Sequence, residues 1–249
     1  MARVGMMKAW GFKGFRILAA LALGSALAGC ATPGNEPDDP LESVNRVVFD
    51  FNQRLDRNAA LPAASYYAET VPSPVRGHVH NVLANLSGPV TAANYVLQGE
   101  FSYAGDALGR FVVNTTIGVI GIYDVATEWG MPERNRDFGL TLGTVGVPAG
   151  PYLVIPLGGS TALRDLAGSY VDGFFSPLRY IGSYSGRPYV GMFKNAIGTV
   201  DNRSRNIESF RDIERNSVDY YATMRDSYLQ RRTRLIEEKN VMTAELPDF

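Results

Sequence analysis

The first clear repeat of apolar residues in the chain begins shortly after residue 40. Five side chains recur at intervals of three and four residues, which is the spacing of one face of an α-helix: Val44, Val47, Val48, Phe51 and Leu55. The pattern predicts an amphipathic helix here, with Ser43 or Asp39 as candidate N-cap residues.

Further helices are predicted along the first half of the chain. One repeat ends at the helix break Gly88-Pro89, and its members are Val79, Val82, Leu83 and Leu86. Residues 90–98 and 103–113 predict two more helices joined around Gly99. Because no segment alternates strictly between apolar and polar residues, we expect a mostly helical protein.

Residues 111–129 form the most apolar internal stretch, which is 19 residues long. The stretch contains six polar or acidic residues, and a lipid-exposed spanning helix would rarely carry so many: Asn114, Thr115, Thr116, Asp124, Thr127 and Glu128. Gly118 and Gly121 lie one turn apart on one side. We therefore expect a core helix, or a helix that lies within a single membrane leaflet.

Residues 138–160 interleave glycine and proline with Leu, Val, Ile and Tyr. Repeated Gly and Pro exclude a long regular helix, yet the intervening side chains are too apolar for a loop in water. An apolar irregular loop must be buried in protein or must line a cavity. An ordinary buried loop and a gating or pore-lining loop both remain open interpretations.

Residues 202–239 are strongly charged and carry apolar residues at three- and four-residue spacing. The pattern predicts an amphipathic helical arm that is broken near Asn216-Ser217. Its basic cluster at residues 231–234 is suited to lipid headgroups or an acidic partner, although charge runs usually face water and a solvated helix end is the favoured interpretation.

The N-terminus carries an export signal. Four basic residues precede an uncharged run at residues 17–27, which is too short to span a bilayer. The run ends in Leu27-Ala28-Gly29-Cys30, which resembles a bacterial lipobox and contains the only cysteine of the chain. We expect residues 1–29 to be removed, Cys30 to be lipidated and residues 30–40 to form a flexible tether. In such lipoproteins Ala31 after the cysteine implies sorting to the outer membrane.

The composition excludes several classes of protein. One Cys and two His are too few for an ordinary zinc site or a disulfide framework. Removal of the signal leaves 20 basic and 25 acidic residues, a net charge of −5, so nucleic-acid binding is not expected. Only two of the remaining basic residues are lysines, Lys194 and Lys239.

A search for catalytic groups finds little. His78 and His80 alternate around Val79, so they point to different sides of a helix start, as surface or capping histidines would. The run from Gly182 to Gly186 has Tyr where a nucleophile elbow has Ser. There is no phosphate-binding or dinucleotide fingerprint. Five acidic residues stand singly and cannot be paired from sequence: Asp106, Asp124, Asp137, Asp165 and Asp172. We do not expect an enzyme.

Many ordered blocks between about residues 39 and 180 resemble one family, the MlaA (VacJ) outer-membrane lipoproteins. The blocks are Asp39-Pro40-Leu41-Glu42, residues 45–52, residues 71–76, Asn85-Leu86, Leu97-Gln98-Gly99, Gly109-Arg110-Phe111, residues 114–118, Asp124-Val125-Ala126, Asp137-Phe138-Gly139, Thr141-Leu142-Gly143, Gly150-Pro151-Tyr152 with Pro156, Arg164-Asp165 and Asp172-Gly173-Phe174. A weaker similarity to the family is found at Asp219-Tyr220, Arg225 and residues 228–231.

The resemblance implies an all-α fold, a ring-like bundle of amphipathic helices embedded in one membrane leaflet, with a Gly/Pro-rich hairpin loop and no substantial β-sheet. It implies a single helical domain at residues 41–239 and a short tail at 240–249. It also implies an outer-membrane component of a phospholipid transport system, lipid-anchored on the periplasmic side. Its expected partners are phospholipid, a trimeric porin and a soluble periplasmic lipid carrier, and its only cofactor-like group would be the lipid on Cys30.

Site roles follow from the same resemblance. In the family, phospholipid is expected to pass through a central amphipathic channel. Gly143, Gly146 and Gly150 match the hinge of a loop thought to gate this channel, while Pro148 departs from the family pattern. Residues 45–52, with Asn45, Phe49, Phe51 and Asn52, are expected to give structural support near the inner leaflet. Arg110 and Arg164 are candidates for headgroup contacts, although satisfied core salt bridges are favoured.

Two alternatives from other classes remain. A structural or adhesion lipoprotein would bind no lipid beyond its own anchor and would leave lipid asymmetry untouched when deleted. A lipid-modifying hydrolase would react with a serine probe or release fatty acid in vitro.

Overall fold

The computed structural model describes residues 39–184 and 189–244, and most of their regular structure is helical, as expected. The first half contains α2 (Glu42–Leu55), the π-helical turn η1 (Asp56–Ala60), α3 (Leu61–Thr70), α4 (Ser73–Asn85), α5 (Gly88–Leu97), α6 (Phe101–Thr116) and α7 (Val125–Glu128). The second half contains α8 (Phe138–Thr144), β1 (Tyr152–Ile155), β2 (Gly159–Ala162), α9 (Leu163–Phe175), α10 (Pro177–Tyr184), α11 (Val190–Arg205), α12 (Ile207–Asn216) and α13 (Tyr220–Ala244).

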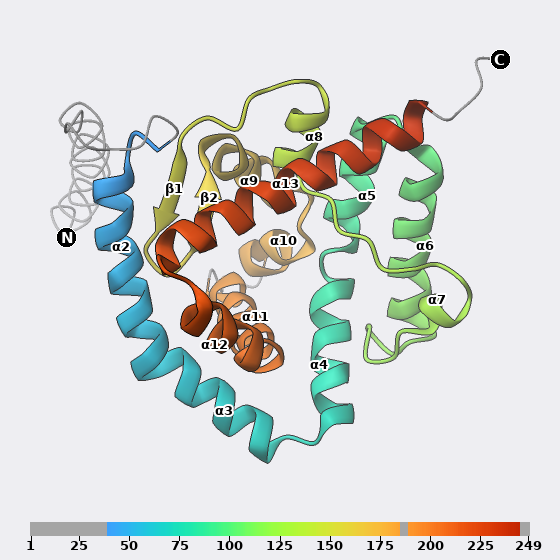
Figure 1. Ribbon diagram of the computed structural model, residues 1–249. Coiled ribbons are helices and arrows are strands. Elements are labelled where there is room, and N and C mark those ends of the chain that lie inside the picture. Colours follow the sequence, from blue (N-terminus) through green and yellow to red (C-terminus); the bar gives the residue numbers. More distant parts are fainter. Residues whose placement is uncertain (1–38, 185–188, 245–249) are drawn as a thin grey trace, which may run out of the picture.

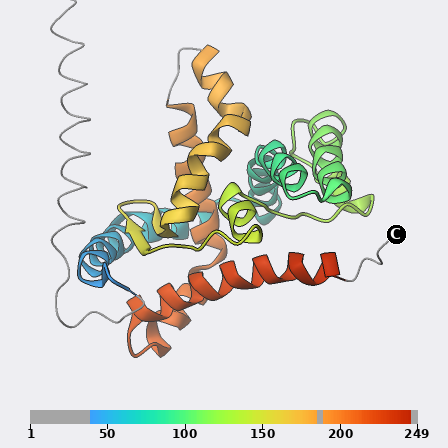
Figure 2. The same ribbon diagram turned by 90° about the horizontal axis from the view of Figure 1, so that it is seen from above.

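The helices follow one another around a ring. In Figure 1, α2 and α3 form one side of an arc, α4 and α5 form the other, and α11 and α12 lie inside it. The helix α13 crosses one face. Seen at right angles in Figure 2, α13 lies along one side of the ring while α10 and the end of α9 rise on the opposite side. The expected ring-like arrangement of helices is therefore present.

Glycine, proline and aspartate set many of the helix boundaries. Pro89 stands in the first turn of α5, where its missing N–H is not needed. Gly99 separates α5 from α6 with a φ of 76°, a left-handed conformation that favours glycine. Asp124 and Asp137 cap α7 and α8 by accepting hydrogen bonds from the backbone N–H groups of Thr127 and Leu140. The helices predicted at residues 90–98 and 103–113 are confirmed.

The first predicted helix is present as α2, but its cap was predicted wrongly. Leu41 occupies the N-cap position without a side-chain hydrogen bond, so neither Ser43 nor Asp39 caps the helix. Asp39 is instead fully buried beneath Tyr221, which donates a hydrogen bond to it, so the end of the expected tether is fixed in the core. Residues 31–38 and Cys30, the expected lipidation site, lie outside the described residues.

Most of the apolar face of α2 does not point into the protein, although Val48 packs against the core. Val47 and Phe51 expose 70% and 52% of their surface, whereas the buried residues of the helix are Asn45 and Phe49. Phe49 joins Tyr152, Val154 and Tyr221 in one small core cluster, and a second cluster joins α5 to α6 through residues that are mostly alanine: Ala92, Tyr95, Ala104 and Ala107. Two separate clusters fit a ring better than a single central core.

The expected helix over residues 111–129 is wrong. The helix α6 ends at Thr116, and Val119, Ile120 and Gly121 follow with φ values of 55°, 58° and 88°. Three consecutive left-handed residues turn the chain sharply before α7. Within the described residues, no helix is both long enough and apolar enough to cross a membrane.

The segment at residues 138–160 is more regular than expected. It begins with α8, which spans seven residues, and continues into an antiparallel hairpin in which Tyr152 pairs with Ala162 and Ile155 pairs with Gly159. The expectation of a hairpin loop with no substantial sheet is met, since these two short strands are the only sheet in the described residues.

The charged arm is divided as predicted near Asn216, where α12 ends before α13 begins at Tyr220. A further boundary at Asn206 separates α11 from α12 and was not predicted. The helix α13 continues to Ala244, so it extends into the segment expected to be a tail from residue 240.

Candidate functional site

Three cavities open between the helices of the ring, and they adjoin one another. The α10–α11 cavity (1040 Å³) lies between α5, α9, α10 and α11; the α2–α11 cavity (790 Å³) lies between α2, α4 and α11; the α13 cavity (900 Å³) lies beneath α13. Asn135, in the extended segment that leads to α8, borders all three. The space inside the ring is therefore branched around this residue.

The walls of the cavities are chemically mixed. In the α10–α11 cavity the apolar residues Leu86, Val90 and Leu178 face the same space as three cations, Arg136, Arg179 and Lys194. Such a lining suits a ligand that has both an apolar body and an anionic head. No sequence motif pointed to this combination, because its residues come from five separate segments.

Lys194 borders two of the cavities, and no hydrogen bond or ion pair is found for its ammonium group among the described residues. Burial therefore lowers the pKa of this lysine. One weak signal in the sequence pointed to Lys194, since it is one of only two lysines after the signal segment.

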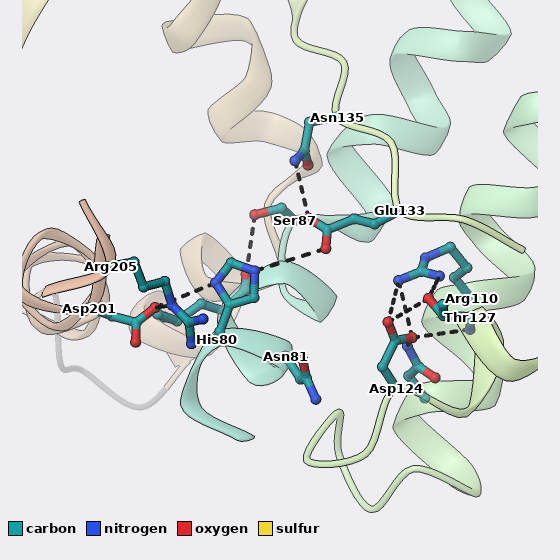
Figure 3. Close-up of polar contacts among 12 residues, drawn as sticks. His80, Asn81, Ser87, Arg110, Asp124, Thr127, Glu133, Asn135, Asp201 and Arg205 are labelled. Carbon is teal, nitrogen blue, oxygen red and sulfur yellow. Dashed lines mark hydrogen bonds and ion pairs between the residues drawn. The ribbon is translucent and has the colours of Figure 1, made fainter. Parts of the chain in front are cut away.

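Figure 3 shows a chain of charged contacts, three members of which line the α2–α11 cavity: His80, Glu133 and Asp201. His80 Nδ1 lies 3.4 Å from the buried carboxylate of Asp201, and its Nε2 lies 4.0 Å from Glu133. Arg205 pairs with the same Asp201 at 2.9 Å. His78 turns away, with Nδ1 3.0 Å from the carbonyl of Ile122, so the two histidines do point to different sides.

The segment predicted to support the structure does so through two amides. The Asn45 side chain donates to the carbonyl of Tyr152 and accepts from the N–H of Val154, both at 2.9 Å. Two helical turns later, Asn52 makes the same pair of bonds to Ile155 and Leu157. Both amides thus bind the hairpin to α2, and Phe49 packs in the same cluster as Tyr152 and Val154 of β1, whereas Phe51 is exposed.

The three glycines of the predicted hinge differ from one another. Gly146 and Gly150 have φ values of 87° and 70°, as turn residues do, and a side chain at Gly146 would meet open space. Gly143 lies within α8, where a Cβ would stand 2.5 Å from Ile236 of α13. Its role in the structure is close packing. None of the three borders the cavities described above, but the hairpin tip at Leu157–Gly159 borders the α2–α11 cavity.

Arg110 and Arg164 form internal ion pairs, as the favoured interpretation held. Arg110 binds both carboxylate oxygens of Asp124 at 3.1 Å and also donates to the carbonyl of Met131 (Figure 3). Arg164 is buried, pairs with Asp165 at 2.9 Å and donates to the carbonyl of Val147 at 3.1 Å. Both guanidiniums are held inside the protein by these contacts, and the Nη2 of Arg164 is buried without a hydrogen-bond partner.

The basic cluster at residues 231–234 contains one partly buried residue, Arg232, whose role the sequence did not reveal. Arg232 binds Asp137 at 2.6 and 2.8 Å and Asp165 at 2.8 Å, so it ties α13 to α8 and α9. Burial alone would raise the pKa of Asp137, but the hydrogen bonds and charge of Arg232 hold that pKa below its ordinary value. Arg231 and Arg234 are exposed beside the α13 cavity.

The acids that stood singly in the sequence are engaged in structural contacts. Asp106 pairs with Arg134 at 3.2 Å, and Asp172 accepts from Asn94 at 2.7 Å and from the N–H of Phe138 at 3.1 Å. In the part of the chain that the structure describes, no group of three or more His, Cys, Asp and Glu side chains could hold a metal ion. Part of the run from Gly182 to Gly186 lies outside the described residues.

The fold and the site together define a class of protein. Its members are rings of helices that enclose adjoining cavities of mixed polarity and expose large apolar side chains. The family model described as MlaA lipoprotein matches residues 37–235. The chain belongs to the MlaA lipoprotein family.

Named relatives agree with this assignment. The chain is 36% identical over 225 residues to the "Intermembrane phospholipid transport system lipoprotein MlaA" of Escherichia coli, covering 86% of each chain. It is 33% identical over 222 residues to the protein of the same name from Haemophilus influenzae, covering 86% of this chain and 87% of that one. A solved structure, described as "Structural basis for maintenance of bacterial outer membrane lipid asymmetry", superposes with a TM-score of 0.72 at 32% identity over 80% of this chain and 98% of the other.

Proposed function

We propose that this protein is the outer-membrane lipoprotein of a phospholipid transport system that maintains lipid asymmetry. It removes mislocalised phospholipid from the outer leaflet through its internal cavities and passes it to a soluble carrier in the periplasm. The names of the relatives support the system and the substrate class. The observation that carries the proposal is the set of three adjoining cavities that meet at Asn135.

The outer surface supports placement in one leaflet. Large apolar side chains stand exposed on several helices of the arc, among them Val47 at 70%, Tyr66 at 70% and Phe101 at 72%. Exposed apolar surface on this scale needs a cover, and lipid acyl chains are a suitable one. A ring that lies in a single leaflet keeps its apolar surface in lipid and brings its cavities to the lipid headgroups.

Transport in this proposal is passive, and no bond is made or broken. A phospholipid has an apolar body and a charged phosphate, so its path needs apolar walls with a few cationic positions, which is how the α10–α11 cavity is lined. Gly146 and Gly150 would allow the loop before the hairpin to move and gate the path. In the structure this loop is held by α9, because Arg164 donates from its side chain to Val147 and from its backbone to Ala149.

The anchor and partners complete the proposal. Acyl chains on Cys30 hold the protein on the periplasmic side of the outer membrane, since several chains give stable anchoring where one does not. A trimeric porin is proposed as its neighbour in the membrane, and a soluble lipid-binding protein as the acceptor. The energy for net movement comes from binding to that downstream carrier.

The test is the level of outer-leaflet phospholipid in a deletion strain, read by an acylation assay specific to that leaflet. We expect accumulation on deletion, with rescue by the wild-type gene and no rescue by Cys30→Ala. An unchanged outer leaflet on deletion would favour the structural or adhesion lipoprotein instead.

A further inference from the structure

Arg136 is an unusual residue in the interior of this protein. Its side chain is more than nine-tenths buried, its Nε atom has no hydrogen-bond partner, and it forms no ion pair with a described residue. Its guanidinium stands 5.7 Å from the centre of the Tyr95 ring. Tyr95 is a neutral partner, so the buried guanidinium has no counter-charge among the described residues, and an anion from outside the chain would satisfy it.

The position of Arg136 indicates where that partner would lie. The residue borders both the α10–α11 cavity and the α13 cavity, next to Asn135, where all three cavities meet. Lys194 on α11 and Arg179 on α10 border the same α10–α11 cavity. Three cations from three separate segments therefore face one space.

The acids of this cavity do not cancel that charge. Asp137 is paired with Arg232 at 2.6 and 2.8 Å. Because Arg232 is not one of the three cations, this pairing leaves Arg136, Arg179 and Lys194 without a carboxylate from Asp137. Asp172 is held by two neutral donors, the N–H of Phe138 and the amide of Asn94, so its one negative charge remains and offsets only one of the three cations. The space keeps an excess of positive charge, which attracts an anion.

The chemistry of the cations selects the kind of anion. A planar guanidinium donates two parallel hydrogen bonds to a phosphate, and an ammonium serves as a point charge for the same group. The cavity also contains apolar walls at Leu86, Val90 and Leu178 that suit a glycerol backbone and the start of an acyl chain.

We propose that Arg136, together with Lys194, forms a binding station for the phosphate of a phospholipid headgroup at the point where the cavities meet. This inference rests on the proposed function and adds the residues that recognise the substrate. The station holds the headgroup midway, between the leaflet and the exit beneath α13.

The experiment uses the full-length lipidated protein in vesicles of phosphatidylethanolamine and phosphatidylglycerol, with a photoreactive amino acid in place of Leu178. Capture of trace radiolabelled phospholipid is compared with capture of diacylglycerol, which lacks the phosphate. The variants are Arg136→Gln, Arg136→Lys and the matched control Arg211→Gln. Arg211 is a surface arginine paired with Glu208 on α12 and borders none of the three cavities.

We expect Arg136→Gln to lower phospholipid capture about tenfold, the effect of losing a hydrogen bond to a charged group, and to leave diacylglycerol capture unchanged. Arg136→Lys keeps the charge and should retain much of the capture, and Arg211→Gln should match wild type. Thermal unfolding of each variant shows that the fold is intact.

Other outcomes overturn the proposal. If Arg136→Gln lowers both lipids equally, or neither, Arg136 does not recognise phosphate. If inorganic phosphate lowers wild-type capture to the level of Arg136→Gln, the site takes free phosphate and the headgroup assignment is wrong. If the wild-type protein captures neither lipid, the proposed function and the phosphate station are both wrong. If the wild-type protein and Arg136→Gln capture phospholipid equally well, only the phosphate station is wrong.

Discussion

Asn45 and Asn52 lie two turns apart on α2, and their side chains hydrogen-bond to the backbone of the hairpin in place of a neighbouring strand. Each amide satisfies one carbonyl and one N–H of the hairpin, which is what a paired strand would do. The sequence showed the helical spacing, but the usual rule that apolar residues face inward hid the role of the amides. That rule reverses where the outside of a protein is apolar.

The two asparagines should differ in their effect on stability. Asn45 is buried at 2% exposure, so Asn45→Ala leaves the backbone groups of Tyr152 and Val154 unsatisfied inside the protein. We expect a loss of about 2–4 kcal/mol in the free energy of unfolding. Asn52→Ala should cost about 1 kcal/mol, because Leu157 is exposed and water can replace the amide. Denaturant unfolding in detergent measures both; equal losses would contradict this account.

The role of Arg232 could not be predicted from the residues around it. A run of three arginines in four positions looks like a solvated helix end, and for Arg231 and Arg234 it is. The partners of Arg232 lie at Asp137 and Asp165, far away in the sequence, so only the fold brings them together.

This ion-pair network predicts a pH dependence. The pKa of Asp137 is lower in the folded protein than in the unfolded chain, so its contribution is present at neutral pH and is lost as the pH falls below its ordinary value of 3.8. Arg232→Gln should cost about 3 kcal/mol at pH 7, where it leaves the carboxylate of Asp137 without its cation, and less at pH 3, where that carboxylate is protonated in the unfolded chain. Unfolding at the two pH values measures this. The control Arg231→Gln should change the free energy of unfolding by less than about 0.5 kcal/mol. A loss from Arg232→Gln that is the same at both pH values would refute the ion pair with Asp137 as the source of the effect.

At the scale of elements, helices with strong periodicity were predictable and the irregular segments were not. The break at Gly88-Pro89 and the helices on either side of Gly99 follow from local chemistry. The family resemblance implied the hairpin at residues 152–162, but the local pattern did not indicate its strands, because they have four residues each and β1 is completed by amides from α2. The left-handed turn at Val119 and Ile120 uses residues that normally avoid such a conformation, so nothing local marks it.

The loop between α8 and β1 offers a test of gating. Gly146 has a φ of 87°, which asparagine tolerates and proline, fixed near −65°, does not. Gly146→Pro should therefore restrict the loop and reduce removal of outer-leaflet phospholipid, while Gly146→Asn should behave like wild type. The acylation assay compares the two strains. Wild-type levels of outer-leaflet phospholipid with Gly146→Pro, at equal protein abundance, would exclude a gate in this loop.

At the scale of the whole molecule, the decisive features are the ring and the space inside it. Family resemblance supplied both as expectations, whereas composition and periodicity indicated only a helical protein. The cavity residues Asn135, Arg136 and Lys194 come from segments that the sequence does not connect. Their alignment depends on how α11 fits inside the arc of α3 and α4 (Figure 1), which is a property of packing.

The central claim is that lipid moves through these cavities, and one measurement tests it most directly. Asn195 borders both the α10–α11 and the α2–α11 cavities, so Asn195→Trp places an indole in the path. The control Glu208→Trp puts the same group on the surface of α12, where the Glu208 side chain is 73% exposed. Outer-leaflet phospholipid is measured in a deletion strain complemented with each variant at equal abundance. The account predicts accumulation as in the deletion for Asn195→Trp and normal levels for Glu208→Trp; full complementation by Asn195→Trp would contradict it.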